Sequence, residues 1–280
     1  MIKLTKLTFG YSPRKTVFRD LNLTLTPGTL YGLLGKNGAG KSSLLRLMGG
    51  MLYPQAGQLQ VAGFEPAKRQ AAFLQTIYFI PEEIYLPTVS LQRYINTMAP
   101  FYPNFNEGQF RRYLNEFEVP KDQKLTAMSY GQKKKVVISF ALATNTPILI
   151  MDEPTNGLDI PSKSQFRRIV ASTLSPDRLI LISTHQVRDL DNLIDAVIVL
   201  DESEILLNHT LAQIADRLRF DNVASMAQTE RVLYAEPSLR GQAVVLENWA
   251  QQDSKVDLER LFNTVLSNRE RIKTLFHELQ

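Results

Sequence analysis

GKNGAGKS, at residues 35–42, is the most informative segment of this sequence. Its spacing is G-x-x-x-x-G-K-[ST], in which the glycines allow successive backbone N–H groups to face one point. The preceding residues, Thr29–Leu34, are typical of a buried strand, and those that follow, Ser42–Met48, of a helix. In such a loop the ammonium of Lys41 can neutralise phosphate charge, and the hydroxyl of Ser42 can ligate Mg²⁺. This context favours a triphosphate site over a glycine-rich surface turn.

A second strand, ILIMD at residues 148–152, is followed by Glu153 and so ends in two adjacent carboxylates. In a parallel sheet these carboxylates lie at the carboxyl edge, where ligands bind. Asp152 is suited to hold Mg²⁺, and Glu153 is suited to accept a proton from the water that attacks a γ-phosphate. An acidic pair after a strand is often only a solvated turn, but its position downstream of a phosphate loop predicts a catalytic role.

The order of apolar patterns predicts an α/β fold built on a parallel sheet. Strand patterns alternate with helical ones, and two amphipathic stripes, at residues 91–98 and 110–117, predict that the block from about 88 to 143 is mostly helical. After about residue 220 the pattern changes to two strands followed by two apolar helical stripes. We therefore expect an ATPase domain over residues 1–219, with a helical subdomain at about 88–143, and a small α+β appendage over residues 220–280.

Composition excludes several classes of protein. The chain of 280 residues has no cysteine, so it has no disulfide framework, thiolate nucleophile or cysteine-ligated metal. Its longest apolar stretches are about eight residues, whereas a membrane-spanning helix needs roughly twenty, and we expect a soluble intracellular protein. The net charge of +4 comes without a basic tail, so we expect no nucleic-acid partner. We interpret the basic triplet at residues 133–135 as a solvated helix face.

Three further segments complete a set of motifs. Residues 129–132 read SYGQ, residues 156–159 read NGLD, and residues 183–185 read STH. With the phosphate loop and the carboxylates, in this order, they resemble the ATP-binding cassette (ABC) ATPases, the nucleotide-binding subunits of ABC transporters. In that family they would be the signature motif, normally Leu-Ser-Gly-Gly-Gln, the D-loop and the switch-histidine loop. The resemblance covers residues 1 to about 215 and implies a P-loop NTPase cassette with a mixed sheet and an inserted α-helical subdomain.

The resemblance also implies roles for individual residues, with ATP and Mg²⁺ as cofactors. It implies catalytic roles for Glu153, His185 and Glu82. It implies Mg²⁺ ligation by Ser42, Asp152 and Glu82. It implies that the ring of Tyr11 stacks on adenine and that some of the contacts with ATP are made across a dimer. The residues implied to contact ATP are Tyr11, Gly35, Lys36, Asn37, Gly38, Ala39, Gly40, Lys41, Ser42, Ser43, Ser129, Gly131, Gln132 and Asp159.

Two motifs depart from the family pattern. The signature segment has Tyr130 where the family has glycine, and Met128 where the family has leucine. After the strand at Ile77–Ile80, Glu82 stands where the family has a glutamine that approaches Mg²⁺ and the attacking water. A carboxylate can still meet the metal, although it adds negative charge beside the γ-phosphate. Our hypothesis is that Glu82 is a functional replacement for the glutamine.

By the same resemblance, the partners are a second cassette and a membrane protein. Two cassettes would pair head to tail as a homodimer, with each ATP held between the phosphate loop of one and the signature motif of the other. A separate transmembrane subunit of the ABC-2 exporter type would hold the chain at the inner face of the cell membrane, on the cytoplasmic side. Two alternatives are a stand-alone ABC ATPase in cofactor assembly and a regulatory cassette of low activity, the latter suggested by Tyr130 and Glu82.

Overall fold

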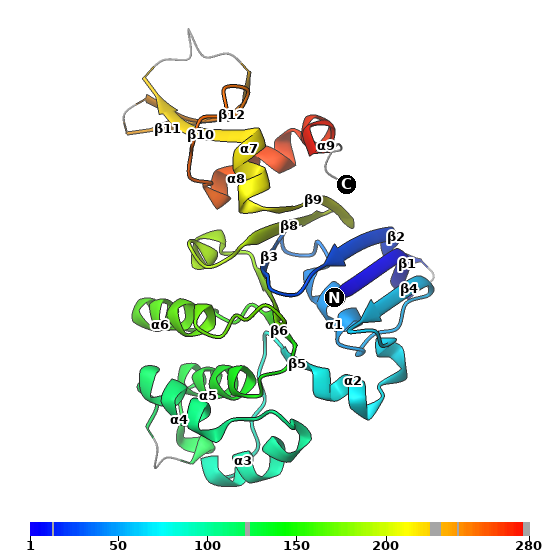
Figure 1. The fold of residues 1–280 in the computed structure, drawn as a ribbon, viewed down its shortest axis with the longest axis vertical. Coiled ribbons are helices and arrows are strands. Elements are labelled where there is room, and N and C mark those ends of the chain that lie inside the picture. The colour runs from blue at the N-terminus through cyan, green and yellow to red at the C-terminus, as the bar shows by residue number, and fades with distance from the viewer. Residues whose placement is uncertain (13, 121–123, 225–230, 240, 277–280) are drawn as a thin grey trace.

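The centre of the molecule is a six-stranded sheet in the order β5-β6-β7-β3-β8-β9 (Figure 1). The computed structural model describes residues 1–280 apart from residues 13, 121–123, 225–230, 240 and 277–280. Neighbouring strands of the sheet are parallel, except that β8 and β9 are antiparallel. The strands are β3 Leu30–Leu34, β5 Ile77–Ile80, β6 Ile148–Asp152, β7 Leu179–Thr184, β8 Ala196–Asp201 and β9 Glu204–Thr210. The prediction of an α/β fold with a mixed sheet is confirmed.

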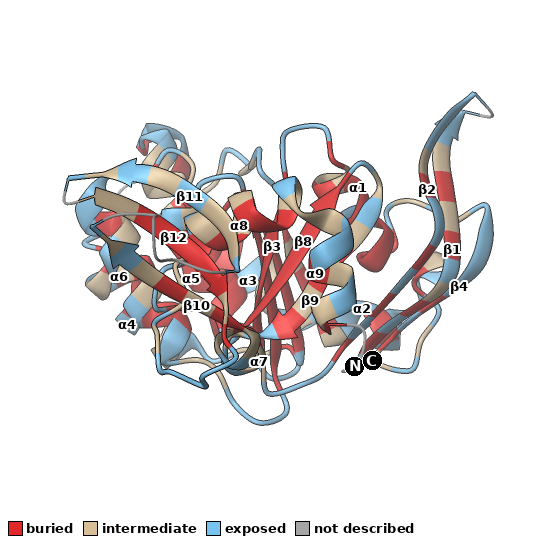
Figure 2. Ribbon diagram, turned by 90° about the horizontal axis from the view of Figure 1, so that it is seen from above, coloured by how far each residue is buried: buried red, intermediate tan, exposed pale blue. Residues whose placement is uncertain are grey.

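This main sheet is buried on both faces (Figure 2). In β6, Leu149 and Met151 belong to one apolar cluster, while Ile148 and Ile150 belong to another. Because successive side chains of a strand point to opposite faces, the two clusters cover the two faces of the sheet. The first cluster includes residues of α3 Leu91–Met98, α4 Glu107–Glu116, α5 Tyr130–Ala143 and α6 Ile160–Ala171. The second includes residues of α1 Lys41–Met48, α2 Ala71–Thr76 and a second sheet.

The second sheet has three antiparallel strands in the order β2-β1-β4. Their bounds are β1 Ile2–Ser12, β2 Lys15–Leu25 and β4 Ala56–Val61. The alternation of leucines predicts β2, whereas β1 is not apparent from the sequence. The register of β1 shifts between Leu4 and Leu7, and Lys6 lies between them with a φ of 47°. Its buried side chains therefore do not alternate along the whole strand, which removes the period-2 signal.

Helices fill the block at 88–143, as the apolar periodicity predicts; residues 121–123 of this block lie outside the described residues. Each helix begins at a side chain that accepts a backbone N–H, namely Ser90 for α3, Asn106 for α4 and Ser129 for α5. Phe140 of α5 connects these helices to β5, because its ring contacts those of Tyr78, Tyr94, Tyr102, Phe105 and Phe110.

The carboxyl-terminal part forms a third sheet covered by helices. Its elements are α7 Leu211–Arg217, β10 Leu218–Val223, β11 Val232–Ser238, β12 Gly241–Glu247, α8 Leu258–Ser267 and α9 Arg269–Phe276. The sheet is antiparallel in the order β10-β12-β11, and α8 packs against β11, β12 and β8. The two strands and two helices expected from the sequence are found, with β10 in addition; Leu279 of the second helical stripe lies outside the described residues. β10 spans the expected boundary between residues 219 and 220.

Short 3₁₀ segments link several elements, at Pro66–Lys68, Ala99–Phe101, Leu125–Ala127 and Val187–Leu190. Within the described residues, no helix combines the length and the apolar character needed to cross a membrane.

Candidate functional site

Four neighbouring strands of the main sheet end at one edge, and a predicted site segment follows each of them. The order β5-β6-β7-β3 brings Glu82, the pair Asp152 and Glu153, His185 and the loop at residues 35–42 to this edge. These strands are parallel and their ends are level in register, so the segments after them lie side by side. Ligands of parallel α/β sheets bind at this edge.

The loop at residues 35–42 requires glycine at two positions for different reasons. A Cβ atom at Gly35 would lie 2.4 Å from the carbonyl oxygen of Leu200, closer than any side chain allows. Gly40 has a φ of +104°, in the left-handed region, and a Cβ there would lie 2.9 Å from the ring of Phe18. Helix α1 begins at the next residue, and the unpaired N–H groups of a helix start attract anions.

Lys41 is buried at the start of α1. Its Nζ donates hydrogen bonds to the carbonyl oxygens of Gly35 (2.7 Å) and Lys36 (3.2 Å). Burial lowers the pKa of Lys41, and the negative charges of Glu153, Asp152 and Glu82 oppose that shift. The ammonium group therefore lies within the electrostatic field of the carboxylates that the sequence predicts as its neighbours.

Glu153 is buried and has one engaged and one unengaged carboxylate oxygen. Its Oε1 accepts the backbone N–H of His185 (2.9 Å) and contacts Nδ1 of the same histidine (2.8 Å). An ionised carboxylate can only accept, so Nδ1 carries the proton in this contact. Oε2 is buried and accepts no hydrogen bond from any described residue. Oε2 is therefore an unsatisfied acceptor at the carboxyl edge of the sheet.

Asp152 is buried beside Glu153, and its Oδ1 accepts a hydrogen bond from Ser183 Oγ (2.5 Å). Ser183 was not identified as a site residue from the sequence, although it belongs to the STH segment. Within the described part of the chain, no three His, Cys, Asp or Glu side chains form a cluster that could hold a metal ion by themselves. Any cation at this edge would need further oxygen ligands, such as those of bound phosphates.

Tyr11 lies beside the beginning of α1. Its hydroxyl is 2.8 Å from Ser43 Oγ, and its ring packs edge-on against Phe9 at a centroid distance of 5.1 Å. Tyr11 is 53% exposed.

The signature segment forms the start of α5. Ser129 Oγ accepts the N–H of Gln132 (3.2 Å), and Gln132 Oε1 accepts the N–H of Ser129 (2.9 Å). Since α5 packs on the opposite face of the sheet from α1, this segment is not joined to the loop at residues 35–42; the described residues show no hydrogen bond between them. Asp159 caps α6, because its Oδ1 accepts the N–H of Ser162 (2.9 Å).

The interpretation of the basic triplet as a solvated face is wrong for its central residue. Lys134 is fully buried, and its Nζ donates to backbone carbonyls of Glu153 (2.8 Å), Asn156 (3.0 Å) and Glu82 (3.4 Å). Backbone acceptors leave no pattern in a sequence, which is why this contact was missed.

A second group of contacts also escaped the sequence analysis. Thr155 Oγ1 donates to Asp189 Oδ2 (2.6 Å), and Lys163 Nζ lies 2.8 Å from the same oxygen. These contacts tie the segment after Glu153, helix α6 and the 3₁₀ turn after His185 to one another.

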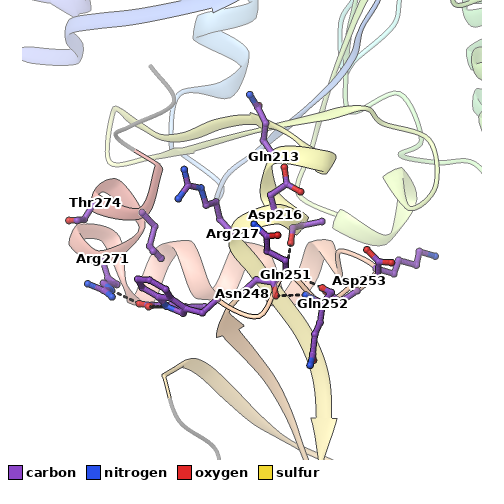
Figure 3. A pocket seen from close by; sticks show the side chains of 15 residues that line it. Gln213, Asp216, Arg217, Asn248, Gln251, Gln252, Asp253, Arg271 and Thr274 are labelled. Atoms are coloured by element: carbon purple, nitrogen blue, oxygen red, sulfur yellow. Dashed lines mark hydrogen bonds and ion pairs between the residues drawn. The ribbon is translucent and has the colours of Figure 1, made fainter.

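A separate groove of about 1010 Å³ lies among the carboxyl-terminal elements (Figure 3). Asn248 fixes the turn on one side, because its Nδ2 donates to the carbonyl oxygens of Ala215 (2.8 Å) and Gln252 (3.0 Å). Across the groove, Arg271 Nε pairs with Glu247 Oε1 (2.5 Å). None of the residues that line this groove is a predicted site residue.

Comparisons with known proteins point to one family. The chain matches the family described as ABC transporter over residues 18–156. It is 28% identical over 234 residues to the ABC transporter ATP-binding protein NatA of Bacillus subtilis (strain 168). The aligned region covers 80% of this chain and 95% of that protein. It is 30% identical over 210 residues to the bacitracin transport ATP-binding protein BcrA of Bacillus licheniformis. That alignment covers 74% of this chain and 68% of that protein. A solved structure of the ATP-binding subunit of an ABC transporter superposes with a TM-score of 0.68 at 25% identity, over 76% of this chain and 91% of the other.

Proposed function

This chain belongs to the ABC transporter family of ATP-binding proteins, and from that premise we propose that it is the ATP-hydrolysing subunit of a transporter. The observation that carries the proposal is the unpaired, buried Oε2 of Glu153 at the edge that also holds Lys41. Glu153 accepts the proton of the attacking water through Oε2, while His185 holds Oε1 in place. Lys41 binds the phosphates, and the first turn of α1 binds them through backbone N–H groups.

The side chains at the edge fit Mg²⁺ as a cofactor. Ser42, Asp152 and Glu82 supply oxygen ligands, the type that Mg²⁺ prefers, and Mg²⁺ is commonly bound by one or two carboxylates together with substrate phosphates. The lack of a cluster of three acidic or histidine side chains among the described residues agrees with such a shared site. When bound, Mg²⁺ neutralises charge on the phosphates. In this arrangement Glu82 takes the place of the family's glutamine.

A second copy of the chain completes the site. Ser129 and Gly131 lie at the start of α5, across the sheet from α1, so they are available to the ATP of a partner rather than to their own. The hydroxyl of Ser129 accepts the N–H of Gln132 and keeps its own proton free to donate to a γ-phosphate. ATP then stabilises the closed pair because it contacts both chains.

Size-exclusion chromatography of Glu153→Gln tests this pairing. The variant should elute as a dimer with MgATP and as a monomer with ADP, because bound ATP is no longer hydrolysed. Glu153→Gln combined with Lys41→Ala is the matched control and should remain monomeric in ATP. A Glu153→Gln protein that binds ATP and still elutes as a monomer contradicts the pairing.

We further propose that the membrane partner is of the ABC-2 exporter type and docks near β5, holding the chain at the inner face of the membrane. A groove of about 500 Å³ lies between α3 and the segment that follows β5. Ile84, Tyr85 and Met98 contribute to its lining, and Tyr85 is 88% exposed. The groove adjoins Glu82, so a partner seated there could affect the ATP site. The relative BcrA is named for bacitracin transport, which agrees with a transporter subunit.

Co-purification tests the membrane partner. The chain is expressed with the hydrophobic protein encoded beside it, and the membranes are solubilised in detergent. The two should co-purify, and Tyr85→Asp should release the chain, whereas Tyr53→Asp, at another exposed tyrosine, should not. A chain that is recovered without any membrane protein would instead support a stand-alone ATPase in cofactor assembly.

A further inference from the structure

Lys134 lies at an unusual place for a lysine, fully buried in the first turns of α5. Its ammonium has three N–H donors, and three backbone carbonyls accept them, those of Glu153, Asn156 and Glu82. Burial lowers the pKa of Lys134 to about 8, although the charges of the nearby carboxylates oppose the shift. Burying an ammonium group is costly unless its hydrogen bonds are satisfied, so this position is specified by its partners.

Tyr130 reaches the same segments from one turn earlier in α5. Its hydroxyl donates to the carbonyl oxygen of Glu82 (3.0 Å), the same oxygen that Lys134 contacts. Its ring packs on Gly157, where a Cβ atom would lie 3.1 Å from the ring carbons. Gly157 has a φ of +80°, which also favours glycine at this position. We call Tyr130, Lys134 and the three carbonyl groups the Lys134 network.

The Lys134 network joins three segments that belong to different parts of the ATP site. Glu82 follows β5, Glu153 follows β6, and Asn156 and Gly157 form the segment that resembles the D-loop. The side chains that hold them both come from α5 of the helical block, which also packs on the sheet through apolar side chains. A movement of α5 relative to the sheet would therefore move the backbone of Glu153, the proposed general base, together with the backbone at Glu82 and Asn156.

We propose that Lys134, assisted by Tyr130, is a positioning residue that sets the backbone of Glu153 and Glu82 for hydrolysis from within the same chain. This inference rests on the proposed function. It also gives Tyr130 a role: the side chain that departs from the family pattern lies against its own D-loop segment and leaves Ser129 and Gly131 at the helix start. Lys134 acts on the position of Glu153 and does not itself contact ATP.

Steady-state ATPase kinetics of Lys134→Met and of Lys135→Met test this role. Lys135 is the matched control, because it is the next residue and, among the residues that the structure describes, its Nζ donates within the helical block, to the carbonyl oxygen of Phe117 (3.1 Å). For Lys134→Met we expect kcat to fall at least about tenfold, since a small misplacement of a catalytic group is costly, while KM and the Kd for MgATP stay within about threefold. Lys135→Met should keep all three quantities within about twofold.

Hydrogen exchange of the nucleotide-free protein provides a second, independent measurement. In Lys134→Met, backbone amides at residues 153–158 should exchange at least about tenfold faster, while those of β3 and α1 remain unchanged. A kcat within about twofold of the wild-type value, or unchanged exchange at 153–158, overturns the proposal. If the wild-type protein does not hydrolyse ATP, the proposed function fails, whereas the exchange experiment still decides whether Lys134 holds these segments.

If Lys134→Met does not fold, the ATPase kinetics of Tyr130→Phe test the role of the Lys134 network instead. This change removes one hydroxyl from a half-exposed ring and should not affect folding. We expect kcat to fall at least about threefold with KM unchanged, because one of the two donors to the Glu82 carbonyl is lost. An unchanged kcat in Tyr130→Phe then contradicts the role assigned to the network.

Discussion

Glu153 is held in a conformation that only its surroundings make possible. Its φ of 47° lies in the left-handed region, which costs a residue with a side chain roughly 1–2 kcal/mol. Its N–H donates to the carbonyl oxygen of Ser183 (3.1 Å), and its own carbonyl accepts from Lys134 (2.8 Å). With the backbone fixed on both sides and His185 on Oε1, the carboxylate has little freedom to move. Such strain is found where surrounding contacts serve a function.

Glu153→Gln should abolish turnover and spare binding. An amide cannot accept a proton from water at neutral pH, so we expect kcat to fall by about 10²- to 10⁴-fold. The amide oxygen can still accept from His185, so the Kd for MgATP should stay within about threefold. Phosphate-release kinetics and fluorescent-nucleotide binding measure the two quantities. Hydrolysis at the wild-type rate would show that Glu153 is not the general base.

Glu82→Gln should change little, because the carbonyl group of Glu82 is what the Lys134 network holds. Among the described residues, its side chain makes one hydrogen bond, in which Oε1 accepts from Asn156 Nδ2 (3.3 Å), and glutamine retains that acceptor. We expect the ATPase rate to remain within about tenfold of the wild-type rate, as a functional replacement implies. A loss of about a thousandfold in the same assay would mean that the carboxylate itself is required.

Helix α5 was predictable in extent but not in its contacts. Its capping box is local and its place in a mostly helical block follows from the helices before it, although residues 136–143 are a continuous buried run without helical periodicity. The carbonyl partners of Lys134 lie 19, 22 and 52 residues away, and backbone groups carry no residue identity, so its burial could not be inferred. By contrast, the loop at 35–42 directly follows a strand and Asp152 and Glu153 lie at the end of another, so their places at the sheet edge could be predicted.

The capping boxes at the starts of α5 and α7 provide a matched pair of variants. Ser129→Ala and Thr210→Ala each remove a side chain that accepts the N–H of the third helical residue. Each should lower the free energy of unfolding by about 1 kcal/mol, measured by urea denaturation. Only Ser129→Ala should lower kcat/KM for ATP, because its hydroxyl also faces a partner's γ-phosphate in the proposed dimer. Equal ATPase activity in the two variants would contradict that assignment.

At the scale of the whole molecule, the carboxyl-terminal elements share a core with the cassette. Val265 of α8 and Ile272 of α9 lie in the same apolar cluster as Val197 of β8. Arg269 at the start of α9 pairs with Asp201 and with Glu202 (2.7 Å). The sequence indicated an appendage because its pattern changes near residue 220, but packing between distant segments decides whether it is separate. We propose that residues 220–280 are a subdomain whose stability depends on the cassette.

His209 makes the attachment of α9 sensitive to pH. Its ring stacks on Phe276 of α9 at a centroid distance of 4.8 Å, and burial lowers the pKa of His209 below its ordinary value. Below the ordinary histidine pKa of about 6.5, the imidazole of His209 binds a proton more readily in the unfolded chain than in the folded one. The free energy of unfolding therefore falls as the pH drops below that value. The unfolding temperature of His209→Gln should fall less than that of the wild type between about pH 7.5 and pH 5.5. Identical falls in a thermal melt would contradict a buried, neutral His209.

The central claim is that the carboxyl edge of the main sheet binds ATP through the loop at residues 35–42. Titration calorimetry with MgATP tests it most directly, using the wild-type protein and Lys41→Ala, each shown to be folded by circular dichroism. We predict a saturable heat of binding for the wild-type protein and none for Lys41→Ala. No heat for the folded wild-type protein, or equal heats for the two proteins, would contradict the account.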